Sequence, residues 1–163
     1  GLLGFATAGG LTLGTEQATT SGTSVTFGSI PAGTKVIIVT FQGVSFTASA
    51  TLRVQLGDAG GIETTGYVTT TSSVEAVPAL YASTAEFTIG RGVAGDISSG
   101  QLILTLLNSS TFLWTGLSIS KQSTTLVHVG AGDKALSAEL TQLTISGVAG
   151  ETFDAGSVNI AYQ

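Results

Sequence analysis

Short apolar stretches with a period of two residues are the feature that most limits what this chain can fold into. Residues 51–56 alternate apolar and polar side chains, and residues 157–162 repeat the alternation. This spacing is typical of β-strands that bury one face. The longest apolar runs, such as Val36–Val39, last only a few residues, whereas a membrane-spanning helix needs about 20. The chain is therefore expected to fold from short strands.

Seven stretches have strong strand patterns, namely 34–46, 51–56, 100–107, 113–120, 126–129, 140–145 and 157–162. Weaker patterns occur at 11–16, 24–27, 66–70 and 85–89. Glycine and polar turns separate them at the spacing of a sandwich or barrel. The predicted fold is all-β: a single antiparallel, jelly-roll-like β-sandwich of about ten strands over residues 14–163, preceded by an N-terminal arm, residues 1–13.

Three local expectations accompany this fold. The stretch 100–107 is apolar on both faces, so it is predicted to be a central strand buried on both sides. Residues Thr69–Tyr81 contain three consecutive threonines, two serines and Pro78, and they are predicted to form a long exposed loop. Helix signals are nearly absent, and residues 133–140 are compatible with one helical turn at most.

Charge is sparse and limits the partners of the chain. Of the 163 residues, 9% are charged, against about 25% in ordinary globular domains. The net charge is −5, and the five basic residues are scattered: Lys35, Arg53, Arg91, Lys121 and Lys134. Without a basic cluster, binding to nucleic acid or to an anionic membrane is not expected. The chain has no cysteine, which excludes disulfides and cysteine-ligated metals.

Several segments resemble a module of structural proteins of tailed bacteriophages. The segments Ser29–Lys35, Phe41–Ser45, Leu52–Tyr67 and Phe153–Tyr162 carry the resemblance, and Gln-Leu-Gly-Asp and Phe-Asp-Ala-Gly-Ser are its specific parts. The resemblance implies a β-sandwich exposed on a virion, either as a head decoration or as a tail-fibre component. It implies self-assembly into a homo-oligomer, with a trimer as the expected form, and contact with other virion proteins such as the major capsid or tail proteins. It carries no catalytic residues.

Catalytic and metal-binding patterns were weighed against simple structural roles. Residues 90–95 match the glycine spacing of a dinucleotide loop, but a strand follows where a helix is required, so a glycine turn is predicted. His128 is the only histidine, and it is predicted to point to the opposite face from Val127 and Val129. The loop acids have no calcium-loop spacing: Asp58, Glu63, Asp133, Glu139, Glu151 and Asp154. We therefore expect no enzyme activity, cofactor or metal; a small hydrolase is the weakest alternative.

Three aromatic residues are candidates for surface contact. Tyr67 and Tyr81 border the predicted threonine-rich loop, and Trp114 is the only tryptophan. An exposed aromatic ring could stack on a sugar, although packing in the core is the favoured interpretation for Trp114. The main alternative to a virion protein is therefore a carbohydrate-binding or adhesin module that attaches to a host surface glycan.

Overall fold

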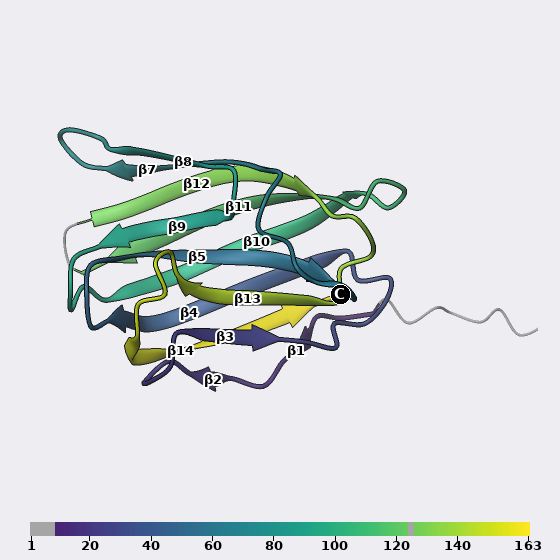
Figure 1. Ribbon diagram of the computed structural model, residues 1–163, viewed down its shortest axis with the longest axis horizontal. Helices are drawn as coiled ribbons and strands as arrows, with labels where there is room; N and C mark the ends of the chain where they lie inside the picture. The colour runs from purple at the N-terminus through teal and green to yellow at the C-terminus, as the bar shows by residue number, and fades with distance from the viewer. Residues whose placement is uncertain (1–8, 124–125) are drawn as a thin grey trace, which may run out of the picture.

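The computed structural model of the protein describes residues 9–123 and 126–163. All regular structure in these residues is β, and every pairing of strands is antiparallel. Two sheets form a sandwich-like fold (Figure 1). The prediction of an antiparallel all-β fold is thus confirmed.

The larger sheet has nine strands. They are β1 (Thr12–Leu13), β2 (Gln17–Ala18), β4 (Val36–Phe46), β7 (Tyr67–Val74), β8 (Leu80–Ser83), β10 (Ser98–Asn108), β11 (Leu113–Gln122), β12 (Leu126–Ala135) and β14 (Phe153–Tyr162). Their order across the sheet is β1-β14-β4-β10-β11-β12-β7-β8, and β2 also pairs with β14. The first and last segments of the described chain therefore lie side by side at one edge.

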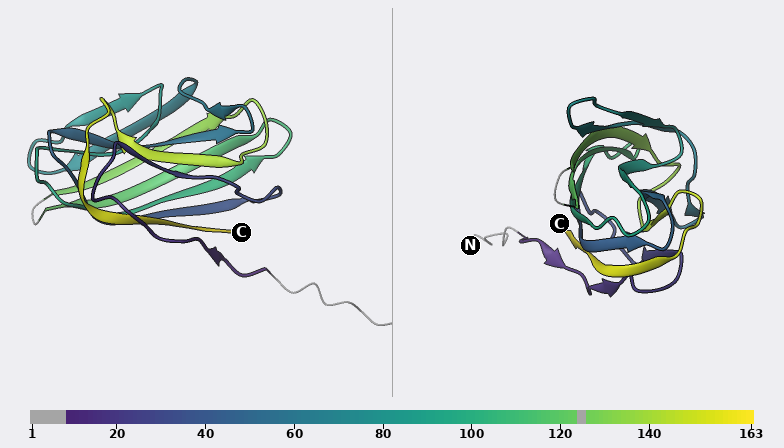
Figure 2. Two further views of the ribbon diagram at one scale, coloured as in Figure 1. Left: turned by 60° about the horizontal axis from the view of Figure 1, so that its bottom comes forward. Right: turned by 90° about the vertical axis from the view of Figure 1, so that its left-hand side faces the viewer.

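The smaller sheet has five strands. They are β3 (Ser24–Phe27), β5 (Ala50–Asp58), β6 (Gly61–Ile62), β9 (Phe87–Gly92) and β13 (Gln142–Gly147). Their order is β3-β13-β5-β6, and β9 also pairs with β5. The end view in Figure 2 shows the two sheets curving around a shared interior.

The apolar core lies where β4 and β10 face β5 and β13. Its most deeply buried members alternate along these strands: Ile37, Val39, Leu52, Val54, Leu56, Leu102, Leu104, Leu143 and Ile145. Phe46 stacks on Phe153 at one end of the core, with ring centroids 4.7 Å apart. On β5 the period-two pattern of the sequence identifies the inward face correctly, because Leu52, Val54 and Leu56 are buried.

The described part of the chain has fourteen strands where about ten were expected. The strands without a predicted counterpart are β2, β6 and β8. β2 and β6 contain two residues each, which is too short for a periodic pattern to reveal, and β8 begins in the stretch that was predicted to be a loop. In the predicted arm, residues 1–8 lie outside the described residues, and Thr12 pairs with Tyr162 in the sheet.

The predicted loop Thr69–Tyr81 is wrong. Most of it forms strands β7 and β8, which pair as a hairpin at one edge of the larger sheet (Figure 1). Its threonines and serines alternate between buried and exposed positions, because the hydroxyls of the buried ones bond inside the protein. The possible helical turn at 133–140 is also wrong, since Asp133 and Ala135 belong to β12.

Candidate interaction surface

Strands β7, β11 and β12 have the reverse of the usual sandwich arrangement. Apart from Tyr67, Trp114 and the half-buried Leu126, their inward residues are glycine or polar: Thr69, Thr71, Ser73, Gly116, Ser118, Ser120, Gln122, His128, Gly130, Gly132 and Lys134. The residues between them, which face outward on β11 and β12, include several large aliphatic side chains. A sandwich ordinarily places apolar residues inside and polar residues outside. Here that order is inverted.

The close approach of β9 explains the polar interior. β9 packs across β7, β11 and β12. The hydroxyl of Thr71 donates to the carbonyl of Thr88 at 2.5 Å, and the hydroxyl of Ser120 donates to the carbonyl of Ile89 at 3.3 Å. A Cβ atom at Gly116 would lie 2.6 Å from the Phe87 ring. Gly116, Thr71 and Ser120 therefore suit the positions next to β9, because glycine lets the strands approach and the hydroxyls bind the β9 backbone. The larger His128 fits on the same inner face because its neighbour on β9 is Gly90.

The outward aliphatic residues form one continuous patch, which we call the apolar face. It consists of Ile103, Leu117, Ile119, Val127, Val129 and Ala131. Leu117 pairs with Ile103 on one side and with Ala131 on the other, and Ile119 pairs with Val129. Leu117 is 56% exposed and Ile119 is 50% exposed. Large contiguous exposed patches of this kind mark interaction sites.

The apolar face also corrects the prediction for β10. This strand is central, between β4 and β11, and its inward residues Leu102 and Leu104 are buried. Its outer side is not buried within the chain: Ile103 is half-buried and Leu107 is exposed. The prediction that β10 is buried on both faces is therefore correct for its inner face and wrong for its outer face.

Two of the three aromatic candidates for surface contact do not lie at the surface. Trp114 is 2% exposed and belongs to the core, so the favoured interpretation of this residue is confirmed. Tyr67 is 1% exposed, and its hydroxyl accepts from the Leu56 amide at 2.7 Å and donates to the Glu63 carbonyl at 3.0 Å. Only Tyr81, on β8, is partly accessible. The prediction that Tyr67 or Trp114 makes surface contacts is therefore wrong, because both side chains are buried.

The acids Asp58 and Glu63 are brought together, but they bind groups of the protein itself. Glu63 accepts from the Lys134 ammonium and from the Ser137 amide, and Asp58 accepts from the Ser137 hydroxyl at 2.6 Å and the Gly60 amide. The hydrogen bonds from Ser137 and Gly60 lower the pKa of Asp58. Within residues 9–123 and 126–163, no group of three or more His, Asp or Glu side chains is arranged to hold a metal ion.

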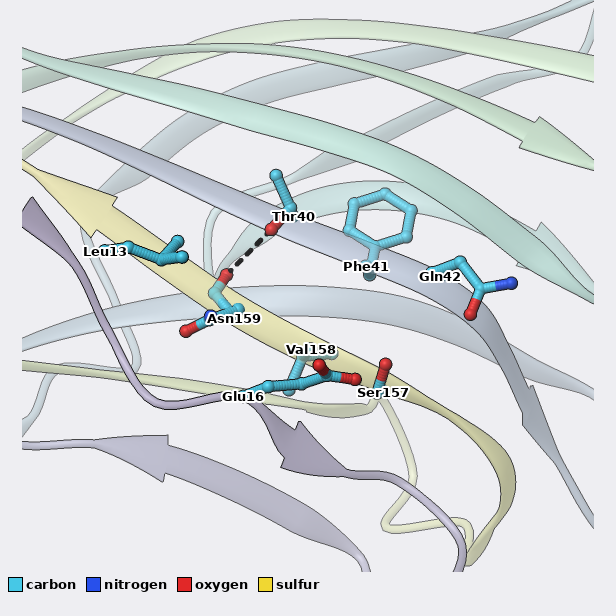
Figure 3. A pocket seen from close by; sticks show the side chains of 8 residues that line it. All are labelled: Leu13, Glu16, Thr40, Phe41, Gln42, Ser157, Val158 and Asn159. Atoms are coloured by element: carbon cyan, nitrogen blue, oxygen red, sulfur yellow. Dashed lines mark hydrogen bonds between the residues drawn. The ribbon is translucent and has the colours of Figure 1, made fainter. Parts of the chain in front are cut away.

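A shallow groove lies on the outer side of β4 and β14, beneath the N-terminal strands (Figure 3). Its volume is about 390 Å³. It is lined by Leu13, Glu16, Thr40, Phe41, Gln42, Ser157, Val158 and Asn159. Hydroxyl and amide groups dominate its polar lining, and Glu16 is its single titratable side chain. The groove can therefore offer hydrogen bonds, but it lacks a pair of groups for acid–base chemistry.

His128 is buried beneath β9, with 1% of its surface exposed. As predicted, it points away from Val127 and Val129, which are outward. Among the described residues its Nδ1 atom has no hydrogen-bond partner, and a Cβ atom at Gly90 would lie 2.8 Å from it. Desolvation by burial lowers the pKa of His128, although Glu75 opposes the shift. The imidazole is therefore held neutral and closed off from solvent.

Burial of neutral His128 makes stability depend on pH. The unfolded chain binds a proton at this residue below pH about 6.5, and the folded chain resists it, so the free energy of unfolding falls as the pH drops from 6.5 towards 5. The expected slope is at most about 1.4 kcal/mol per pH unit. Urea unfolding across this range should show the slope in the wild type and lose it in His128→Asn. Equal slopes in both proteins would show that His128 is not the source of the pH dependence.

Known proteins provide no match to this chain. No protein-family model matches it, no curated protein matches its sequence, and no solved structure matches its fold. In the part of the chain that the structure describes, no helix is long and apolar enough to cross a membrane.

The residues of the apolar face were not among the sequence-based candidates, although their alternation with serine, glycine and histidine is visible in the sequence.

Proposed function

We propose that the protein is a non-enzymatic structural protein of a bacteriophage particle. In this proposal its jelly-roll-like sandwich lies at the virion surface, as a head decoration or a tail-fibre component. It assembles into a closed homo-oligomer, for which the resemblance of the sequence favours a trimer. It also contacts other virion proteins, such as the major capsid or tail proteins.

The observation that carries this proposal is the apolar face. Burying one Leu or Ile side chain stabilises an assembly by about 1.5–3 kcal/mol, and the face presents several of them side by side. Interface cores are depleted of charged residues, as this face is. The more conspicuous titratable groups serve the fold: His128 is sealed beneath β9, and Glu63 binds Lys134. These features favour assembly over catalysis.

Immuno-electron microscopy tests the proposed location. Antibodies raised against this protein should label intact phage particles produced from a genome that encodes the chain, at regular positions on the head or the tail. Particles from a phage with the gene deleted are the control and should carry no label. Labelling of the host envelope alone, with bare particles, would contradict a virion role.

A carbohydrate-binding or adhesin module is the second candidate. The groove in Figure 3 favours it, because Gln42 and Ser157 offer an amide and a hydroxyl group that suit sugar hydroxyls, whereas the Asn159 side chain already donates to the Gly14 carbonyl. Binding of the isolated protein to a glycan array, abolished by Gln42→Ala, would favour this function. Glycan binding and virion labelling together would identify the groove as the attachment site of a phage appendage.

A further inference from the structure

We propose that the apolar face binds the same face of a second copy of this chain across a two-fold axis. The inference rests on the self-assembly in the proposed function and names the surface and the symmetry through which it occurs. Four observations carry it: the aliphatic composition of the face, the placement of its two flanking charges, the ion pairs inside the chain, and its size.

The charges at the borders of the apolar face are complementary to one another. Lys121 extends outward at one end of β11, beside Val127, and Asp133 extends outward at the opposite end of β12, beside Thr115. Both side chains are exposed. In the described residues the ion pairs are Arg53–Glu86 and Lys134–Glu63, so neither Lys121 nor Asp133 has an ionic partner there.

A two-fold axis brings these charges together. The axis lies in the plane of the contact and runs perpendicular to the strands, so it reverses the strand direction in the second copy. Lys121 and Thr115 are six positions apart, roughly 20 Å along the strand. An axis midway between them places Lys121 of each copy over the end of the partner's sheet that carries Asp133. The contact is then isologous, with each ion pair formed twice.

A three-fold axis parallel to the strands does the opposite at this face. It would gather all copies of Lys121 at one end and all copies of Asp133 at the other, and like charges placed together repel. A trimer would therefore have to use another surface, such as the sheet edges at β1 and β8. A two-fold contact through the apolar face is compatible with such a trimer only in an even-numbered assembly, for example a hexamer.

The size of the outer side of the sheet suits a stable contact. Six strands, from β14 to β7, are separated by five strand spacings and span about 24 Å, and four outward positions span about 20 Å along them. The projected area is about 500 Å², and the accessible area of a corrugated sheet is larger. A standard interface buries about 800 Å² per partner. The neutral residues around the apolar face, such as Gln101, Thr105 and Ser72, can complete this area without a charge conflict.

Reversal of the two charges tests the symmetry. The wild type should sediment as a dimer or another even-numbered assembly in analytical ultracentrifugation at micromolar concentration. Lys121→Glu and Asp133→Lys should each weaken the assembly about tenfold or more, because each replaces two attractive contacts with repulsive ones. The double variant should recover the wild-type affinity. All these residues are exposed, so circular dichroism and thermal unfolding should show that the variants fold.

Two further variants separate the apolar face from nonspecific effects. Ile119→Ser, which removes an outward aliphatic group, should dissociate the assembly and leave the fold intact. Arg91→Glu, an equally exposed charge reversal on β9, should leave the mass unchanged. A wild-type trimer would overturn the two-fold inference but leave the proposed self-assembly standing. A wild-type monomer would overturn both the two-fold inference and the proposed self-assembly. Failure of the double variant to recover the wild-type affinity would overturn the two-fold pairing.

Discussion

Lys134→Met is expected to lower the free energy of unfolding by about 2–3 kcal/mol, less than the ~3–5 kcal/mol that removing one partner of a fully buried ion pair costs, because the Glu63 side chain is 22% exposed. The Lys134 side chain is 5% exposed and its ammonium binds the Glu63 carboxylate. It also lies 5.3 Å from the centroid of the Tyr67 ring, which adds a cation–π contact. Methionine preserves the length of the side chain but leaves the carboxylate without its cation.

Urea unfolding at pH 7 measures this loss. Lys121→Met is the matched control, because Lys121 lies on the adjacent strand with its side chain in solvent, and its replacement should change the free energy of unfolding of the isolated subunit by less than about 0.5 kcal/mol. Comparison at protein concentrations too low for self-assembly keeps the control free of any contact at the apolar face. Equal stability of the two variants would show that the Lys134–Glu63 pair makes no net contribution to the fold.

The same pair has a pH signature. Desolvation raises the pKa of Glu63, but the Lys134 ammonium and the amide and hydroxyl of Ser137 outweigh it, so the net pKa lies below its ordinary value. A carboxyl with a lowered pKa in the folded state stabilises the fold above its unfolded pKa of about 4.3, and this contribution is lost as the pH falls through the folded value. The acid loss should therefore be shallower in Lys134→Met. This loss of stability occurs at lower pH than the loss caused by protonation of His128.

Gly156→Ala is expected to lower the free energy of unfolding by about 3 kcal/mol, and the melting temperature by roughly 6–12 °C. Gly156 has a φ of 94°, in a region that costs a residue with a side chain about 1–2 kcal/mol. A Cβ atom there would lie 2.5 Å from the backbone carbonyl of Gly43, and overpacking adds about 1–3 kcal/mol. The site is the irregular pairing of β4 with β14, where the register shifts between Ala155 and Ser157.

Two other glycines separate these two penalties. Gly150 has a φ of 80° but open space around its Cβ position, and Gly28 has open space without a positive φ. Differential scanning calorimetry should rank the alanine variants so that Gly28→Ala is nearly neutral, Gly150→Ala is intermediate and Gly156→Ala melts lowest. If Gly156→Ala melted no lower than Gly150→Ala, the backbone of Gly43 would have moved aside at little cost.

The inverted strands connect the fold with the proposed assembly. If β7, β11 and β12 had aliphatic residues inside and hydroxyls outside, the subunit would be a self-sufficient sandwich. Hydroxyls instead bind the backbone of β9, as Thr71 does with the Thr88 carbonyl at 2.5 Å, and the aliphatic residues face away from the core. The subunit thereby keeps a stable interior while presenting an apolar surface that a second copy can cover.

Much of the fold could be predicted from the sequence, and the candidate site could not. Strands β4, β5, β10 and β14 follow the alternating pattern, since each buries an apolar face against the opposite sheet. Only the first part of the polar hairpin of β7 and β8 had a strand pattern, the weak one at 66–70. The rest was missed, because threonines and serines in a row resemble a loop unless their hydrogen-bond partners are known. Those partners, the carbonyls of Glu86 and Thr88, lie 17 residues further along the chain.

The sequence by itself determined that this chain is built of β-strands, because a period of two fixes the two faces of a strand through local geometry alone. It did not determine which face of β11 and β12 turns inward. An alternation such as Leu-Ser-Ile-Ser at 117–120 fits either orientation of the strand, and only the tertiary approach of β9 selects the serines for the interior. The apolar face exists because that long-range packing leaves room inside for hydroxyls and glycines but not for Leu117 and Ile119.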